Sequence, residues 1–461
     1  KIGLAKALIG QGRFAAARAQ LDSVTEEFQK GQYLVYLALS IYGEGDGLID
    51  SVAFLATLGK ASSVDLEAED LPWLAMLQGL AAELDGQTEI ATASYERALK
   101  LTDQPMLRSH FEGLIMRQKL LASSAAEALV AELRVKIDQL EGQAVAYPFV
   151  REYAVGLYGL GRIGEATSVI ERELDNTSAG YDPGEREQLR LLKGIILGAN
   201  SETGRASLKT LILNGRNRET LGIALQLLAR IPNQDADLLS FLNVVLSRSE
   251  PHRLKGQIYY LRCQLAMKMA QQGLIEERVG LMAIAESDAR TLLDQFPGLS
   301  QITNVYRLLA YAALERQPAQ YRAAADFLIQ LRDQSRESQD LAEVNRLIGD
   351  CYFLNRDFAN SVDFYSAALS RGVGSPRDGE LFLRLISAQI RAGLIKQASQ
   401  LIDQADSSAS ISQADRWRAE WNVAQALQAS GELDLALQRV RLLLRDDSPS
   451  TVPASLDIRL R

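Results

Sequence analysis

Cysteine and histidine are scarce in this sequence of 461 residues, which contains two of each. Two thiols cannot build a disulfide scaffold, and Cys263 and Cys351 both lie in apolar helical contexts, so we expect them to be buried and unbridged. Metal and nucleophile sites commonly use histidine, and His110 and His252 leave little for either. The HExxH, P-loop and G-x-S-x-G motifs are also absent. The sequence therefore indicates that the protein is not an enzyme, and we predict no catalytic residue, no metal site and no cofactor.

An excess of basic charge and long hydrophobic runs are missing too. The chain has 50 Lys and Arg against 58 Asp and Glu, a net charge of −8. A surface that binds nucleic acid needs clustered positive charge, so we predict no nucleic-acid partner. The longest apolar stretch, residues 33–42, is interrupted by Ser40. It has half of the roughly 20 residues that cross a bilayer, and no direct membrane span is predicted.

Both ends of the sequence resemble interrupted helices. The first residue is Lys, and residues 2–10 already have a mid-helix pattern, while residues 448–461 read as a turn and the truncated start of a further element. We therefore expect a fragment of a longer protein. The compartment stays open between a bacterial cell envelope or periplasm and the cytoplasm, and the Ala-rich composition, with Arg favoured over Lys, suggests a bacterial source.

What the sequence does contain is a repeated helical pattern. It is 47% hydrophobic, and its 33 Gly and 11 Pro residues fall at intervals, as expected between helices. After a turn residue, a small residue follows at the fifth position, a larger apolar residue four later and another apolar residue three later. The clearest copy runs from Gly86 through Ala91, Tyr95 and Ala98. The small residues of the other copies are Ala17, Ala166, Ala324, Ser361, Ala398 and Ala436.

The small residues recur with a fixed period. The last four are separated by 37, 37 and 38 residues, and Ala17 precedes Ala91 by 74, which is twice 37. A faded copy is expected at Ala128, 37 residues beyond Ala91. Spacings of three and four place these side chains on one helix face, and the small residue allows two helices to cross closely. The pattern predicts about a dozen stacked helical hairpins, with no sheet.

Two copies of the pattern carry a family resemblance. The run of Gly349, Tyr352, Phe358, Ser361, Tyr365 and Ala368, and the run of Gly79 with residues 86–99, resemble the tetratricopeptide repeat signature. The resemblance implies an all-α, right-handed α-solenoid (a superhelix) of antiparallel hairpins. The period of 37–38 residues departs from the family's 34, which implies longer helices or loops.

The resemblance divides the chain into stretches of different quality. It is good over residues 1–175 and 301–447, whereas residues 176–300 are expected to be degenerate helical repeats with Ala206 as a weak anchor. Residues 448–461 remain as the start of a further element. In the middle stretch, the expected helices cover residues 221–231, 237–247, 257–271 and 288–297.

The resemblance also implies where a partner binds. In this family the first helix of each hairpin lines a concave groove that receives peptides or helices. Carried over position by position, the groove candidates are Trp73, Met76, Leu80, Tyr306, Leu309, Arg346, Asp350, Phe353, Arg384, Trp421 and Gln425.

Two functions follow from these observations. The first is a protein–protein interaction scaffold that binds another protein or a peptide in the groove. The alternative is a regulatory or substrate-recruiting arm of a larger enzyme or transcription regulator whose effector domain lies outside this sequence. The sequence leaves the identity of the partner and the oligomeric state open.

Overall fold

The protein is built from α-helices throughout the part of the chain that the structure describes. This computed structural model describes residues 2–10, 14–22, 30–44, 51–122, 126–248, 252–272, 275–299, 301–334, 338–371, 378–405 and 411–445. Over these ranges there are 24 α-helices and no strand. The predicted all-α fold is confirmed, while the predictions for residues 448–461 lie outside the described residues.

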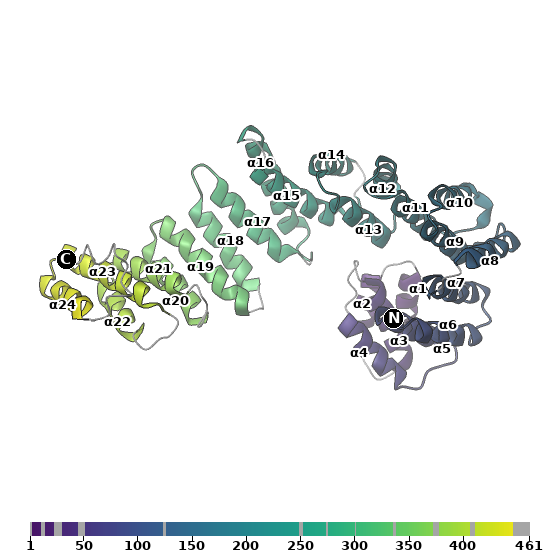
Figure 1. The fold of residues 1–461 in the computed structure, drawn as a ribbon, viewed down its shortest axis with the longest axis horizontal. Coiled ribbons are helices and arrows are strands. Elements are labelled where there is room, and N and C mark those ends of the chain that lie inside the picture. Colours follow the sequence, from purple (N-terminus) through teal and green to yellow (C-terminus); the bar gives the residue numbers. More distant parts are fainter. Residues whose placement is uncertain are drawn as a thin grey trace. The chain divides into compact units, whose positions relative to one another are not determined.

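Backbone contacts divide the chain into two compact units, residues 1–255 (unit 1) and 256–461 (unit 2). This division falls inside the stretch predicted to be degenerate, and the boundaries at 175, 300 and 447 stay predictions. The helices of unit 1 (Figure 1) are α1 (Ile2–Gly10), α2 (Phe14–Asp22), α3 (Lys30–Glu44), α4 (Ser51–Ser62), α5 (Leu71–Leu84), α6 (Thr88–Lys100), α7 (Pro105–Ala122), α8 (Ala126–Gln139), α9 (Tyr147–Gly159), α10 (Ile163–Asp175), α11 (Pro183–Leu197), α12 (Glu202–Asn214), α13 (Arg218–Ala229) and α14 (Asp235–Leu246).

Unit 2 continues the same kind of helix without a change of class. Its first helix, α15, begins at the last residue of unit 1. The helices are α15 (Lys255–Gln272), α16 (Ile275–Gln295), α17 (Ile302–Glu315), α18 (Tyr321–Gln334), α19 (Ser338–Leu354), α20 (Phe358–Arg371), α21 (Asp378–Arg391), α22 (Ile395–Ala405), α23 (Gln413–Ala429) and α24 (Leu433–Arg445).

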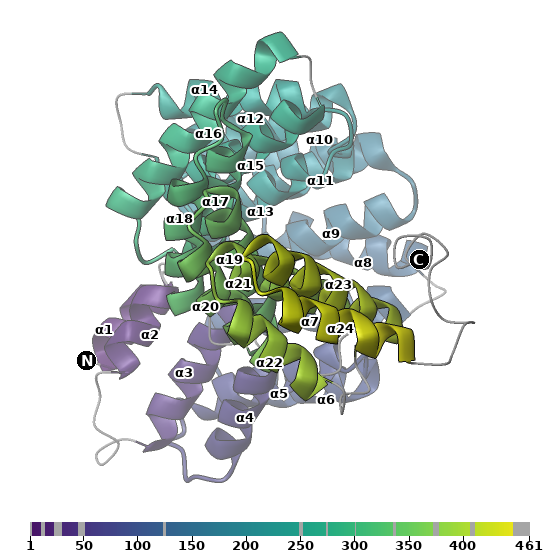
Figure 2. The ribbon, with the colours of Figure 1, turned by 90° about the vertical axis from the view of Figure 1, so that its left-hand side faces the viewer.

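Within each unit, consecutive helices pack as antiparallel hairpins. Closely packed pairs include α5 with α6 in unit 1 and α19 with α20 in unit 2, and the second helix of each pair also packs against the first helix of the next. In Figures 1 and 2, the first helices α9, α11 and α13 form one row and the second helices α10, α12 and α14 form another. The core therefore follows the chain from hairpin to hairpin instead of filling one centre.

The small residues lie at the helix crossings, as the period predicts. Ala91 and Ala398 are fully buried, whereas Glu89 and Lys396, two positions earlier, are exposed. The other predicted small residues are buried as well: Ala17, Ala166, Ala324, Ser361 and Ala436. A larger side chain at these positions would push the two backbones apart.

In several hairpins, the turn between the two helices has the same hydrogen-bond arrangement. Gly86 has a φ of 70°, its N–H donates to the Glu83 carbonyl, and the next N–H donates to the Ala82 carbonyl. The same pair of bonds closes the turns at Gly161, Gly393 and Gly431, which all have positive φ. This is a Schellman arrangement, which satisfies helix C-terminal carbonyls and requires a left-handed residue. Arg356 occupies that position between α19 and α20, with a φ of 63°.

Two hairpins, one in each unit, contain the same polar junction. Tyr95 on α6 donates a hydrogen bond of 2.6 Å to Glu83 on α5, and Arg117 on the next first helix, α7, pairs with the same carboxylate. In unit 2, Tyr365 donates at 2.6 Å to Asp350. Arg384 on α21 also pairs with Asp350.

Each junction depends on a glycine in the first helix. A Cβ added at Gly79 would lie 2.3 Å from the ring of Tyr95, and one at Gly349 would lie 2.5 Å from the ring of Tyr365. Both tyrosine rings are almost completely buried. Glycine therefore makes room for the ring whose hydroxyl reaches the carboxylate.

Three predictions for individual positions are wrong. Ala128 and Ala206 are both exposed. The crossing on α8 is occupied by the buried Val130, and the crossing on α12 by Gly204, which lies 38 residues beyond Ala166. The segment 288–297 is not a separate helix, because α16 runs unbroken to Gln295.

Within residues 176–300, α11 and α12 pack as a regular hairpin, and the degenerate character predicted for the whole stretch stays a prediction. The three helices predicted at 221–231, 237–247 and 257–271 correspond to α13, α14 and α15, whereas α11 and α12 were not anticipated as a pair. Leu238 stands 34 residues after Gly204, where the other hairpins have a small residue, and α13 and α14 pack less closely than the regular pairs. A bulky residue at the crossing accounts for the wider separation.

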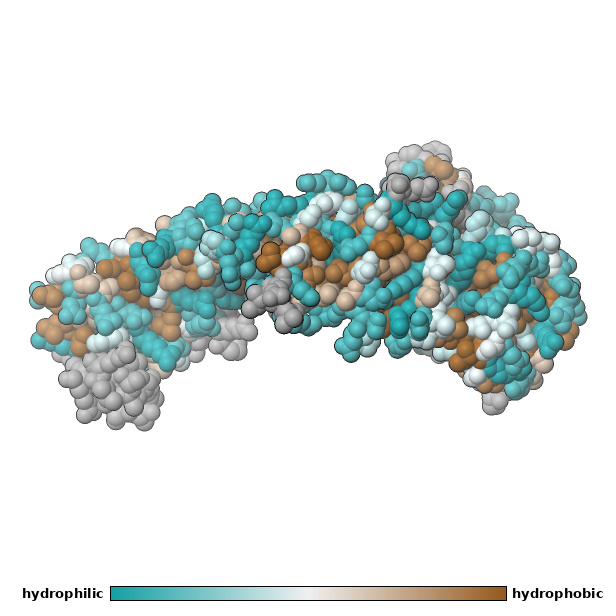
Figure 3. Space-filling view, turned by 90° about the horizontal axis from the view of Figure 1, so that it is seen from above, coloured by the Kyte–Doolittle hydropathy of each residue, from teal (hydrophilic) through white to brown (hydrophobic). Residues whose placement is uncertain are grey.

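Both cysteines are free and buried, as predicted. Burial raises the pKa of the Cys263 thiol to about 12 and that of the Cys351 thiol to about 11. A thiol with so high a pKa is a poor nucleophile at neutral pH. On the face seen in Figure 3, hydrophobic side chains lie in groups with hydrophilic side chains between them.

Candidate functional site

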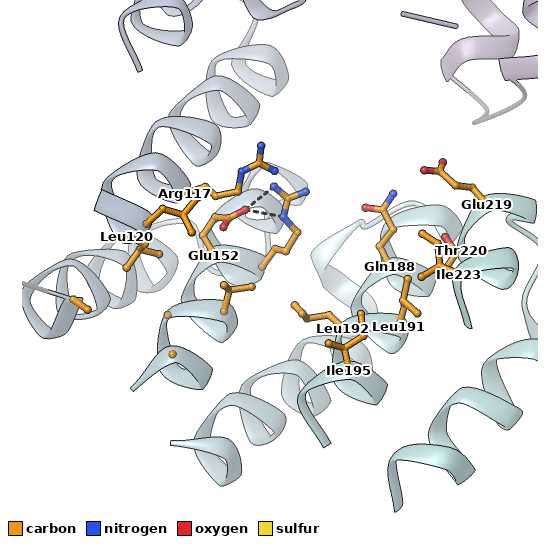
Figure 4. A pocket seen from close by; sticks show the side chains of 16 residues that line it. Arg117, Leu120, Glu152, Gln188, Leu191, Leu192, Ile195, Glu219, Thr220 and Ile223 are labelled. Carbon is orange, nitrogen blue, oxygen red and sulfur yellow. Dashed lines mark hydrogen bonds and ion pairs between the residues drawn. The ribbon is translucent and has the colours of Figure 1, made fainter. Parts of the chain in front are cut away.

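A groove of about 700 Å³ lies on the first helices of unit 1. Four successive first helices line it, namely α7, α9, α11 and α13. Of its lining residues, one belongs to a second helix: Ala126, the first residue of α8. The lining residues are Arg117, Leu120, Leu121, Ala126, Arg151, Glu152, Val155, Gly156, Gly159, Gln188, Leu191, Leu192, Ile195, Glu219, Thr220 and Ile223. Figure 4 shows their side chains around the groove.

The wall of the groove is apolar and partly open to solvent. Leu121 is 73% exposed, Ile195 39% and Val155 37%. α11 has apolar residues on two faces: Leu189 and Ile196 are buried in the core, while Leu192 and Ile195 line the groove. Hydrophobic side chains that remain exposed on a concave surface are typical of interaction sites.

Glycine at the end of α9 keeps the groove open. Gly159 lines it, has an ordinary backbone conformation, and has open space where a Cβ would project. Gly156 differs, because a Cβ there would lie 2.7 Å from Val130 and would disturb the packing of α8. A side chain at position 159 would therefore enter the groove without disrupting the fold.

One margin of the groove is polar (Figure 4). Arg117 uses Nη2 to contact both oxygens of Glu83, at 2.7 and 2.5 Å. Arg151 uses Nε and Nη2 for its neighbour Glu152, at 2.8 and 2.5 Å, and the Glu152 side chain is only 1% exposed. Gln188 accepts a hydrogen bond from the Tyr147 hydroxyl. Glu219 and Thr220 on α13 continue this margin. Two guanidinium groups, the carboxylates that they contact and the carboxylate of Glu219 therefore lie beside the apolar wall.

Titration behaviour at this margin follows from burial and from the two arginines. Burial, and then the positive charges of Arg151 and Arg117, lower the pKa of His110 to about 4. Burial raises the pKa of Tyr147 to about 12. Both groups are neutral at physiological pH, so the positive charge of the margin belongs to the arginines.

The unit 1 residues predicted for the groove lie elsewhere, on α5. Met76 and Leu80 are 5% and 7% exposed and belong to the hydrophobic core, so they present almost no surface to a partner. Trp73 is half-buried against the same core. It lines a second hollow of about 590 Å³ together with Lys6, Glu69 and Asp103.

In unit 2, three predicted groove residues form a charged network. Arg346 pairs with Glu343 and with Asp350, which also pairs with Arg384. Arg384 in turn pairs with Glu380 at 2.7 Å. These charges are compensated within the chain, so a partner would have to break existing pairs to use them.

The remaining predicted residues are not gathered into one site. Leu309 is a core residue, 1% exposed. Tyr306 is half-buried and accepts a hydrogen bond of 3.4 Å from Gln334. Phe353 packs edge-on against Phe358. Trp421 is half-buried and Gln425 is exposed on α23. Whether any of these residues contacts a partner stays a prediction.

The residues of the unit 1 groove were missed at the level of the sequence. The signal that could have identified them is a second apolar stripe on a helix whose first stripe already accounts for packing. Leu191, Leu192 and Ile195 beside Leu189 and Ile196 are an example.

No cluster of three or more His, Cys, Asp and Glu side chains suited to a metal ion occurs within the described ranges. Over the same residues, no helix is long and apolar enough to cross a membrane. The absence of a catalytic residue and of a nucleic-acid partner remain predictions.

Comparisons with known proteins find likeness only among solved structures. No family model matches the chain, and no curated protein shows significant sequence similarity to it. A human IFIT1 dimer with PPP-AAAA is 11% identical, with 95% of each chain covered and a TM-score of 0.30. A Rap protein complexed with Competence and Sporulation Factor is 11% identical, covering 80% of this chain and 96% of that one, with a TM-score of 0.31.

A third similar structure is Naa15/Naa10 bound to HypK-THB. It is 12% identical, covers 95% of this chain and 74% of that chain, and has a TM-score of 0.27. At TM-scores of this size, the likeness carries no argument about the present chain. The fold therefore rests on its own helices, and the function on its own groove.

Proposed function

We propose that this chain is a protein-interaction scaffold and that the unit 1 groove receives a segment of a partner protein. The observation that carries the proposal is the apolar wall formed by four successive first helices, on which Leu121, Val155 and Ile195 remain exposed. Covering such a wall removes apolar surface from water and favours binding. The alternative, a regulatory or recruiting arm of a larger protein, stays a prediction from the sequence.

The experiment compares two glycine-to-tryptophan variants. Gly159→Trp fills the groove, whereas Gly59→Trp places the same side chain at an exposed glycine in α4 that also has open space at its Cβ. Affinity capture from a cell extract, with quantitative mass spectrometry, identifies proteins retained by the wild type. We expect at least one of them to be lost by Gly159→Trp and kept by Gly59→Trp.

Circular dichroism and thermal unfolding of both variants check that the fold is intact. Equal retention of every captured protein by the wild type and by Gly159→Trp would show that this groove is not the binding site.

A further inference from the structure

The groove has a specific chemistry, which points to one class of partner segment. Resting on the proposed function, we infer that the groove binds the apolar face of a partner helix that carries an acidic side chain, and that this carboxylate contacts Arg117. Two independent observations carry the inference: the distribution of polar atoms along the wall and the unused donors of Arg117.

The wall favours a helix over an extended segment. Away from the polar margin the lining side chains are apolar or absent: Leu120, Leu121, Ala126, Val155, Gly156, Gly159, Leu191, Leu192, Ile195 and Ile223. None of these side chains can donate or accept a hydrogen bond. An extended segment would turn backbone N–H and C=O groups toward them and leave those groups unpaired, at a cost in free energy. A helix pairs its own backbone groups and presents an apolar stripe.

The margin favours a carboxylate. A guanidinium group has five N–H donors, and in Arg117 only Nη2 donates hydrogen bonds, both to Glu83. Its Nε and Nη1 make no hydrogen bond to a described residue, although the side chain lines the groove and is 30% exposed. Arg151 adds a second positive charge on the neighbouring first helix, α9. Unused donors of a charged fork are satisfied best by a carboxylate.

The charged groups around Arg117 leave its Nε and Nη1 available. His110 on α7 is half-buried, and burial together with the positive charges of Arg151 and Arg117 lowers its pKa to about 4, so it adds no charge at neutral pH. Glu83 pairs with Arg117 and Glu152 with Arg151, and Glu219 on α13 also lines the groove, so the margin has no excess of positive charge. The preference for a carboxylate therefore rests on the two unused donor nitrogens of Arg117, which a purely apolar or a basic segment would leave unpaired.

Peptide selection followed by substitution on the peptide tests the inference. A random library of peptides about 20 residues long, enough for a helix to span three steps of about 10 Å, is displayed on phage and selected on the full chain. Only peptides that bind the wild type and Gly59→Trp, and not Gly159→Trp, are analysed. We expect helix-forming sequences with apolar residues at i, i+3, i+4 and i+7 and a conserved Asp or Glu.

Replacing that peptide Glu by Gln leaves the folded protein unchanged and should weaken binding about tenfold to a hundredfold, the loss of a charged hydrogen bond. Replacing a Glu on the opposite face of the peptide helix should not change affinity. Amidation of the peptide C-terminus should not change it either, which separates an acidic side chain from a terminal carboxylate. On the protein, Arg117→Lys keeps the charge beside Glu83 and should weaken binding several-fold, with Arg172→Lys on α10 as its control.

The outcomes separate the inference from the proposed function. Peptides that depend on Gly159 but bind equally well with Gln in place of Glu would overturn the carboxylate and leave the groove intact. Selected peptides rich in proline or devoid of helical pattern would overturn the helix. A selection that yields no peptide sensitive to Gly159→Trp would contradict the proposed function itself.

Discussion

The first helices of unit 1 and those of unit 2 occupy equivalent places in their hairpins, yet they carry different side chains. In unit 1, α7, α9, α11 and α13 expose an apolar wall with two arginines at its margin. In unit 2, α19 and α21 carry a network in which Arg346 and Arg384 pair with Glu343, Asp350 and Glu380. The same backbone arrangement can therefore support either an exposed apolar surface that is suited to binding or a surface whose charged groups pair with one another.

Beneath this difference, the two units share the same junction. Glu83 with Tyr95 and Arg117 in unit 1 corresponds to Asp350 with Tyr365 and Arg384 in unit 2, and in both cases the arginine lies 34 residues after the acid. The junction ties a hairpin to the next first helix. In a stacked array, such nearest-neighbour ties set the spacing of the surface that function uses.

The largest expected effect comes from removing the buried ring of this junction. Tyr95→Ala and Tyr365→Ala should each destabilise the protein by about 3–5 kcal/mol, because a large cavity is left between two helices. Hydrogen exchange measured by mass spectrometry should show lost protection around α5–α7 for the first variant and around α19–α21 for the second. Loss of protection throughout both units in either variant would mean that the chain unfolds as one cooperative body, contrary to the stacked arrangement.

Lowering the pH should destabilise unit 1 more than unit 2. Both histidines are in unit 1, and the pKa of His110 is lowered to about 4. The unfolded chain then binds a proton that the folded chain does not, so stability is present above the unfolded pKa of about 6.5 and is lost as pH falls toward 4. We expect a loss of about 3 kcal/mol in unit 1, measured by hydrogen exchange corrected for intrinsic rates.

His110→Gln is the control for this pH dependence. The variant should abolish the loss that unit 1 shows between pH 6.5 and 4 and should leave unit 2 as it is. An unchanged pH profile in the variant would assign the titration to other groups.

A smaller effect distinguishes the two acids of the junctions. Glu83 is the only carboxylate within the described residues that pairs with Arg117, whereas Arg346 and Arg384 each have a second carboxylate beside Asp350. Glu83→Gln should therefore cost about 1.5–3 kcal/mol, and Asp350→Asn less. Urea unfolding of the two variants in parallel measures the difference. Equal losses would show that the additional pairs in unit 2 do not stabilise its junction.

The smallest expected effect concerns a turn. Arg356 has the left-handed φ that Gly86 has in the matching turn of unit 1. Arg356→Gly should stabilise unit 2 by about 0.5–1 kcal/mol, because the relief of strain exceeds the entropy that glycine loses on folding. Gly86→Arg is the matched change and should destabilise unit 1 by about 1 kcal/mol. Thermal unfolding of both variants tests whether the two turns are equivalent.

Much of the fold could be predicted from residue spacing alone. Ala91 and Ala398 are buried where the period places them, since the residues of one helix face are separated by three and four positions and the signal is local. The prediction was wrong at Ala128, because the crossing on α8 lies two positions later at Val130 and a count of positions does not register such a shift. It was also wrong at Ala206, although the period does place a small residue at Gly204, 38 residues beyond Ala166.

The sequence by itself determined the all-helical hairpins, the burial of the small residues and the two free cysteines. The tertiary structure alone decided which first-helix faces are open. Leu80 and Leu309 on first helices are buried, whereas Leu121 and Ile195, also on first helices, are exposed. Exposure depends on how closely successive hairpins stack, which is set by contacts between residues some 35 positions apart, such as Glu83 with Arg117. A groove made by four helices is therefore a property of their packing and not of any one segment.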